Sequence, residues 1–168
     1  PFNITGQAPV ETGNKNIRLT LKSGDRPIDT STVSFSIKNP GQPHRKTFIS
    51  EIDGSLQYYA VNPAYSGSGE PKALFLSVHG ASVEAINQAQ SYHHKTWGHI
   101  VSPTNRRPYG YDWENWGRMD AMEVLNIAKE KYNIDPERIY LTGHSMGGHG
   151  TWYLGVTYPD KWAAIGPS

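Results

Sequence analysis

The first part of the chain alternates between hydrophobic and polar residues in two short segments. In residues 17–21 and 33–37, every second side chain is apolar, a period that is typical of half-buried β-strands. Clusters of Ser, Gly, Asn and Pro follow both segments and favour turns. We therefore predict that residues 1–46 form a small β-rich lead-in, or the end of a preceding β domain.

The next segments predict a hairpin followed by a buried strand. Residues 47–52 and 55–61 have strand patterns on either side of Asp53-Gly54, a dipeptide that is typical of a two-residue type I′ turn. Residues 73–78 are nearly all apolar, as expected for a strand that is covered on both faces.

Helical and strand patterns alternate in the rest of the chain. Residues 82–92 predict a short helix with Ser82 as its N-cap. Residues 119–132 predict a longer helix, because apolar side chains recur three and four positions apart at Met119, Met122, Leu125, Ala128 and Tyr132. Strands are predicted at residues 100–103, 138–142 and 163–166. This alternation predicts an α/β fold with a mostly parallel sheet and helices on its faces.

Composition then excludes several classes of function. Sixteen basic and fifteen acidic residues give a net charge of +1 without a block of like charge, so nucleic acid is not an expected partner. The mean hydropathy is −0.61 and the chain has no long apolar run, so no membrane-spanning helix is predicted. The chain has no Cys, which excludes disulfides, thiolate metal sites and a cysteine nucleophile.

One motif carries candidate chemistry. Gly143-His144-Ser145-Met146-Gly147 fits G-x-S-x-G between a predicted strand and a predicted helix. In such a turn the serine is held in a strained conformation, and the two glycines leave room for neighbouring chain to pass closely. The start of the helix favours developing negative charge. We predict that Ser145 is a nucleophile, that the Met146 N–H is an oxyanion donor, and that His144 packs beside Ser145.

A second oxyanion donor is expected from the loop after an earlier central strand. His79-Gly80-Ala81 follows the apolar run at residues 73–78 directly. We assign the second donor to the N–H of Ala81, with Gly80 as the other choice. One such donor stabilises the transition state by about 2.7–4 kcal/mol.

Residues 139–148, together with Tyr158-Pro159-Asp160, resemble the α/β-hydrolase superfamily. Within it the chain is similar to the prolyl-oligopeptidase-like, phospholipase/carboxylesterase and feruloyl-esterase-like group, over roughly residues 47–168. The resemblance implies the N-terminal part of a hydrolase domain, with helices on both faces of a mostly parallel sheet. It also implies a serine hydrolase that cleaves a carboxylic ester, on a small molecule or linked to a polysaccharide, through an acyl-enzyme on Ser145. That chemistry requires no cofactor and no metal.

The other two members of a catalytic triad are not evident. In this fold the order is Ser, then Asp or Glu, then His. After Ser145 the sequence contains one Asp, one His and no Glu. Asp160 matches a structural turn of the family that the chain resembles, and His149 lies on the first turn of the predicted helix. We therefore expect the chain to be the N-terminal part of a longer enzyme. Its open half-sheet is then expected to associate with the missing C-terminal part or with a partner.

The loop at residues 105–116 is rich in aromatic residues, including Tyr109, Trp113 and Trp116. These three are candidates for stacking on a sugar or an aromatic acyl group. The alternative is that they are buried against the next helix.

Other functions and sites also remain open. A serine peptidase of prolyl-oligopeptidase type is one alternative, although the lead-in is too short for the propeller of such enzymes. A catalytically silent hydrolase fragment or binding protein is another. His93, His94 and His99 lie close in sequence, but no carboxylate is spaced to complete a metal site, so we predict loop or surface histidines. The richness in Asn, Gly, Trp and Tyr, with Pro at the start, favours a secreted or periplasmic protein.

Overall fold

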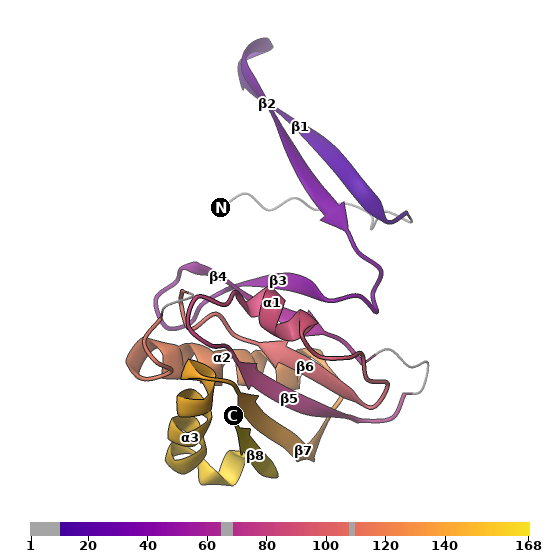
Figure 1. The fold of residues 1–168 in the computed structure, drawn as a ribbon. Helices are drawn as coiled ribbons and strands as arrows, with labels where there is room; N and C mark the ends of the chain where they lie inside the picture. Colours follow the sequence, from indigo (N-terminus) through magenta and orange to yellow (C-terminus); the bar gives the residue numbers. More distant parts are fainter. Residues whose placement is uncertain (1–10, 65–68, 108–109) are drawn as a thin grey trace. The chain divides into compact units, whose positions relative to one another are not determined.

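The computed structural model describes residues 11–64, 69–107 and 110–168. The chain divides into two compact units, one up to Asn39 and the other from Pro40 to Ser168. The first unit contains a two-stranded sheet, and the second contains a six-stranded sheet with its helices (Figure 1).

The first unit is an antiparallel hairpin with one apolar face. Strand β1 (Gly13–Ser23) pairs with β2 (Arg26–Ile37), and Ile17 lies opposite Val33. Residues that face each other across an antiparallel pair share one side of the sheet, so this register gathers apolar side chains on one side. Four of them are 40–63% exposed, namely Leu19, Leu21, Val33 and Phe35.

The second unit confirms the predicted α/β class. Its strands lie in the order β3-β4-β6-β5-β7-β8. The pairs β5–β6, β5–β7 and β7–β8 are parallel, whereas β3–β4 and β4–β6 are antiparallel. The bounds are β3 (His44–Ile49), β4 (Leu56–Asn62), β5 (Lys72–Val78), β6 (Gly98–Ser102), β7 (Ile134–Gly143) and β8 (Ala164–Pro167). Residues 44–46, which the sequence placed in the lead-in, thus form the start of β3.

Helices cover both faces of this sheet. The helices are α1 (Ala85–Gln90), α2 (Asn115–Lys131), α3 (Met146–Thr157) and the 3-10 turn η1 (Pro159–Lys161). Tyr59 and Val61 of β4 pack in a core with α2 and α3, whereas Ala60 between them packs with α1. Because successive side chains of a strand point to opposite faces, these contacts place α1 on one face and the other two helices on the second.

The hairpin between β3 and β4 differs from its prediction. The connection spans residues 50–55, so the predicted two-residue turn at Asp53-Gly54 is wrong. Ser50 donates its N–H to the carbonyl of Ser55, and Gly54 donates to the carbonyl of Ser50, both at 2.9 Å. The Asp53 carboxylate accepts the N–H of Ser55 at 3.1 Å, an interaction that favours a longer loop over a tight turn.

Two helix boundaries were also misplaced by the sequence pattern. Ser82 has a φ of 60°, and α1 begins only after Glu84, so Ser82 is not its N-cap. Helix α2 begins at Asn115, four residues before the predicted start at 119. Trp116 therefore lies in the first turn of α2 rather than in the preceding loop.

A buried carboxylate explains the orientation of α2. Asp120 is fully buried, and its Oδ2 accepts the N–H groups of Thr104 at 3.0 Å and Asn105 at 2.9 Å. Its Oδ1 lies 3.3 Å from Nε of Arg106. Burial raises the pKa of Asp120, while Arg106 and the two amides oppose that shift. The face of α2 that is buried is therefore centred on Asp120 and Ala121, and the predicted Met119 is only partly buried.

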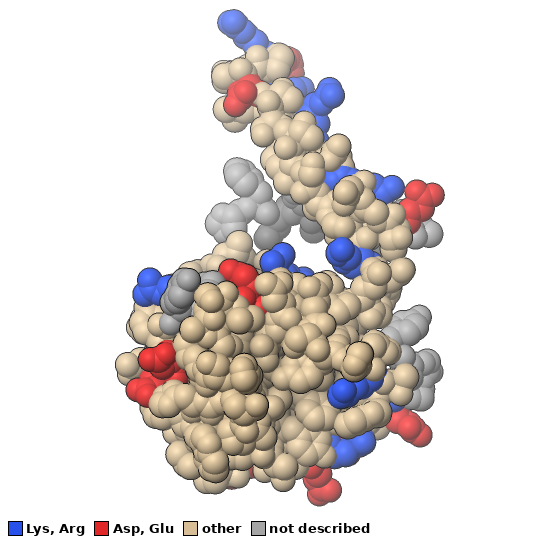
Figure 2. All heavy atoms as spheres, viewed as in Figure 1, with Lys and Arg blue, Asp and Glu red and all other residues tan. Residues whose placement is uncertain are grey.

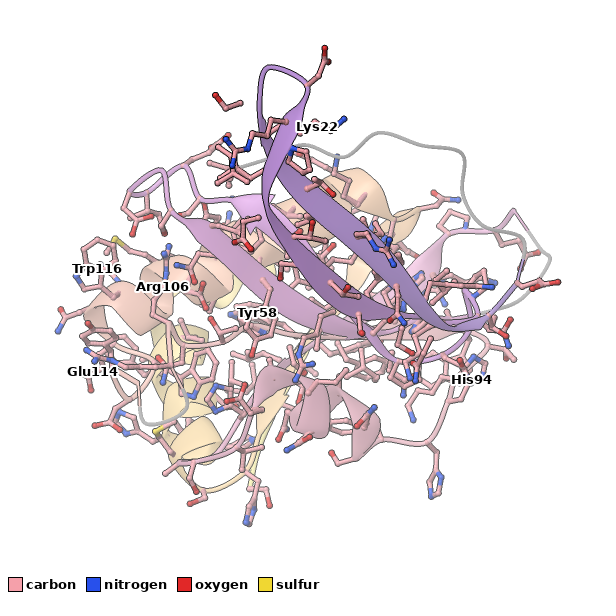
Figure 3. All side chains as sticks on the ribbon, turned by 90° about the horizontal axis from the view of Figure 1, so that it is seen from above. Lys22, Tyr58, His94, Arg106, Glu114 and Trp116 are labelled. Atoms are coloured by element: carbon pink, nitrogen blue, oxygen red, sulfur yellow. The ribbon has the colours of Figure 1, made fainter. Side chains whose placement is uncertain are left out.

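Arg106 connects three segments of the second unit. Its side chain is 8% exposed and pairs with Asp53, Asp120 and Glu123 at 3.3–3.4 Å. Its guanidinium also lies 5.6 Å from the ring centre of Trp116. Figure 3 shows Arg106, Trp116 and Glu114 on the same side of the molecule. The loop after β6 is thereby fixed to both α2 and the β3–β4 connection.

Replacing Asp120 with Asn is expected to destabilise the protein by about 3 kcal/mol, because it removes the most buried of the carboxylates that offset Arg106. Asp53→Asn is the matched control at the more exposed pair and is expected to change the free energy of unfolding by about 0–1 kcal/mol. Urea denaturation at pH 7 measures both. If both variants lost a similarly small amount of unfolding free energy, Asp120 would not be the more important partner of Arg106.

His99 is buried in β6, so the prediction of a loop or surface position is wrong for this residue. Its Nδ1 accepts the N–H of Ala64 at 3.0 Å, and its ring centre lies 4.7 Å from that of Tyr132. Burial, followed by the charges of Lys72 and Lys46, lowers the pKa of His99 from 6.5 to about 4.

This shift predicts a pH dependence of stability. The unfolded chain takes up a proton on His99 near pH 6.5, whereas the folded chain does so only near 4. The neutral ring therefore makes its full contribution to the free energy of unfolding above pH 6.5. As the pH falls towards 4, roughly 1–3 kcal/mol of this contribution is lost. Urea denaturation between pH 7.5 and 4.5 should give a shallower decline for His99→Gln than for the wild type. If stability declined equally with pH in both proteins, His99 would be excluded as the cause of the decline.

Candidate active site

The turn between β7 and α3 holds Ser145 in an unusual backbone conformation. Ser145 is exposed and has φ 58° and ψ −120°. Such a conformation costs a residue other than glycine about 1–3 kcal/mol, and it persists only where neighbouring contacts impose it. Here Ser145 donates its N–H to the carbonyl of Ser168 at 2.8 Å, and its own carbonyl accepts the N–H of His149 at 3.1 Å.

Close backbone contacts explain the glycines around Ser145. A Cβ on Gly143 would lie 2.4 Å from the carbonyl oxygen of Gly147 and 2.5 Å from that of Val78. A Cβ on Gly147 would lie 2.0 Å from the same Val78 oxygen. The end of β5 and the start of α3 therefore touch backbone to backbone, and a side chain at either glycine has no space.

The loop that follows β5 passes directly beside Ser145. A Cβ on Gly80 would lie 3.2 Å from the carbonyl oxygen of His144 and 3.6 Å from Cβ of Ser145. Gly80 does not have a positive φ, so close approach is the reason for glycine here. Among the backbone hydrogen bonds of the residues that the structure describes, none uses the N–H of Ala81 or Met146. The roles of these two N–H groups as oxyanion donors stay predictions.

An open hollow of about 220 Å³ lies at Ser145. Its lining residues come from α3 and the end of β8, namely Ser145, Gly148, His149, Trp152, Pro167 and Ser168. Trp152 is 59% exposed and was not singled out from the sequence. Its position seven residues after Ser145 was the available signal, because residues that are two helical turns apart share a face.

His149 contacts a carboxylate rather than the serine hydroxyl. Its Nε2 lies 3.0 Å from Oε1 of Glu114, which directly precedes α2. Within residues 11–64, 69–107 and 110–168, no hydrogen bond joins a histidine ring to the Ser145 hydroxyl. His144, the variable residue of the turn, is exposed, and its Nδ1 lies 3.4 Å from Oγ of Ser168.

The three aromatic candidates of the loop have different environments. Trp113 is fully buried, and its indole N–H donates to the carbonyl of His79 at 3.0 Å. Trp113 is therefore buried in the protein, as the alternative to stacking on a substrate had it. Trp116 is 38% exposed and packs against Arg106. Tyr109 lies outside the described residues.

The described part of the chain has neither a candidate metal site nor a candidate membrane-spanning helix. It contains no cluster of three or more His, Cys, Asp or Glu side chains that could hold a metal ion. None of its helices is long and apolar enough to cross a membrane.

Comparison with known sequences relates the chain to esterases. The model of a protein family described as "Putative esterase" matches residues 77–167. An "Uncharacterized secreted protein" of Arthroderma benhamiae is 28% identical over 157 residues, which cover 82% of this chain and 17% of that protein. Feruloyl esterase B of Talaromyces stipitatus is 29% identical over 126 residues, which cover 66% of this chain and 35% of that enzyme.

Solved structures share the fold of the second unit. FphF, a fluorophosphonate-binding serine hydrolase of Staphylococcus aureus, superposes with a TM-score of 0.59 at 20% identity, over 77% of this chain and 57% of that one. The chain thus spans only part of the length of each of these proteins. The family match covers more than half of the chain and includes the loop after β5 as well as the turn at Ser145. The chain therefore belongs to this esterase family of the α/β-hydrolases.

Proposed function

We propose that the protein is a serine esterase that cleaves a carboxylic ester through an acyl-enzyme on Ser145. The observation that carries this proposal is the strained, exposed Ser145 at the start of α3, with the loop of Gly80 and Ala81 packed against it. This arrangement supports the proposal that Ser145 is the nucleophile and that the N–H groups of Met146 and Ala81 are the oxyanion donors that acyl transfer requires.

In the proposed reaction, Oγ of Ser145 attacks the ester carbonyl while a base takes the hydroxyl proton. The carbonyl oxygen becomes an oxyanion that accepts hydrogen bonds from the N–H groups of Met146 and Ala81. The tetrahedral intermediate collapses to the acyl-enzyme, and the leaving alcohol receives the proton. Water then attacks the acyl-enzyme with the help of the same base and releases the carboxylic acid and free Ser145.

The base and its orienting acid are proposed to come from residues outside this sequence. His149 is a poor candidate for the base, because its Nε2 already faces Glu114. The chain spans 17–35% of the two curated relatives, so those proteins contain further segments that could supply a histidine and an acid.

The proposed substrate is a neutral ester, including acyl groups linked to carbohydrate. The similarity to feruloyl esterase B supports this choice over the serine-peptidase alternative. On the side of the second unit that Figure 2 shows, charged residues are scattered near the margins and uncharged residues form most of the surface. The exposed Trp152 in the hollow offers an apolar platform beside Ser145. A secreted location is proposed, with support from the relative named as a secreted protein.

Ser145 is expected to react with a fluorophosphonate probe in the complete protein. Mass spectrometry should find one adduct on the wild type and none on Ser145→Ala. His149→Gln is the matched control and should keep the adduct, because the proposed base lies elsewhere. A wild type that folds but forms no adduct would favour the silent hydrolase, and loss of the adduct in His149→Gln would identify His149 as the base.

Removing the N–H of residue 81 is expected to slow the chemical step. Ala81→Pro lacks that donor and should lower kcat by about 100–1000-fold with little change in KM, because the hydrogen bond forms fully only in the transition state. Ala81→Gly keeps the N–H and is the control. Steady-state hydrolysis of p-nitrophenyl acetate measures both variants, and equal kcat values would assign the second donor to another group.

A further inference from the structure

The loop between β6 and α2 has an unusual concentration of backbone strain. Four of its described residues other than glycine have a positive φ of 49–65°, namely Asn105, Arg106, Asp112 and Trp113, and Asn115 at the start of α2 has a φ of 42°. The left-handed region costs such residues roughly 1–2 kcal/mol each. Strain of this kind persists only where the surroundings impose it, and it concentrates at functional sites.

Asn105 imposes much of this loop conformation. Its side chain is fully buried, and Oδ1 accepts the N–H groups of Trp113 at 3.3 Å and Tyr111 at 3.4 Å. A Cβ on Gly110 or Gly117 would lie 1.8 Å from the Asn105 side chain, so only glycine fits at both positions. The loop is therefore wrapped tightly around Asn105, which fixes the backbone of Trp113.

On one side, Trp113 contacts the loop that carries the proposed oxyanion donor. Its indole N–H donates to the carbonyl of His79 at 3.0 Å, and its ring meets the His79 ring edge-on at 4.9 Å. The His79 ring nitrogens each lie 2.9 Å from a carbonyl oxygen, one of Gly80 and the other of Thr104. Trp113 and His79 thus connect the β6–α2 loop with the backbone that passes beside Ser145.

On the other side, Trp113 packs against the helix that begins after Ser145. A Cβ on Gly150 would lie 2.3 Å from Cδ1 of Trp113, so the indole rests directly on the backbone of α3. The hydrogen bond between His149 and Glu114 joins the same loop to the same helix at 3.0 Å.

We propose that Trp113 is a positioning residue that sets the spacing between the loop of the second oxyanion donor, through His79, and the nucleophile helix, through Gly150. The inference rests on the proposed esterase function. Trp113 is fully buried, so its proposed effect on catalysis passes through the segments that it contacts. Its effect on catalysis follows from geometry, because oxyanion donors must lie about 2.7–3.1 Å from the oxyanion and a shift of 1 Å can lower the rate by about 100-fold.

Trp113→Phe tests the proposal, because it removes the indole N–H and part of the ring. Trp97→Phe is the matched control, since Trp97 is 50% exposed and contacts Phe75 instead. Hydrolysis of p-nitrophenyl acetate is measured per active site, counted by complete fluorophosphonate labelling, so that unfolded protein does not contribute.

Trp113→Phe should lower kcat by about 10–100-fold and leave KM within about 2-fold of the wild type. Its affinity for a trifluoromethyl ketone, which binds as a tetrahedral oxyanion, should fall by the same factor as kcat/KM, while binding of the product acid is unchanged. Trp97→Phe should match the wild type in every assay.

The outcomes separate this proposal from the function on which it rests. A wild type that neither labels nor hydrolyses esters refutes the proposed function itself. A labelled wild type together with an unchanged kcat per site in Trp113→Phe overturns only the positioning role, even if the melting temperature falls. If Trp113→Phe does not fold, His79→Asn carries the same test, because it removes the ring that meets the Trp113 indole edge-on, and a wild-type kcat there overturns the proposal.

Discussion

The backbone of β5 touches the backbone of the turn after β7, and the geometry of the candidate site depends on this contact. Val78 and Gly143 are paired in adjacent parallel strands, so both strands end at the same edge of the sheet. The carbonyl of Val78 then lies where a Cβ of Gly147 would be. As a result, the segments that follow the two strands, at Gly80 and at Ser145, run side by side. Parallel pairing and the missing side chains together create the site.

A second layer of buried polar contacts supports this edge of the sheet. Asp120 and Arg106 fix the start of the β6–α2 loop, and Asn105 folds the rest of it. The loop in turn presents Trp113 to His79 and Gly150. The strained φ values of the loop are tolerated because the buried carboxylate of Asp120 and the buried Oδ1 of Asn105 accept backbone N–H groups of the loop, which makes alternative conformations costly.

The described part of the chain separates the components of acyl transfer. Ser145 is exposed at the start of α3 with Gly80 beside it, while three of the histidines contact other groups: His79 faces two carbonyls, His99 accepts a backbone N–H, and His149 faces Glu114. In this fold the base follows the nucleophile late in the chain, which agrees with the proposal that the base comes from a later segment.

The features that depend on local pattern could be predicted from the sequence. The apolar run of β5, the period of α2 and the G-x-S-x-G motif between a strand and a helix are visible as short patterns, so the α/β class and the strand-turn-helix motif could be predicted, although the partner of the two glycines, Val78, is distant in sequence. Tertiary structure alone decided the length of the β3–β4 connection, the buried face of α2 around Asp120, and the burial of His99 and Trp113. These features depend on partners that are distant in sequence, such as Ser50 with Glu123 and Trp113 with His79. Hydrogen bonds to distant backbone and side chains leave no periodic trace, and only the folded chain brings their partners together.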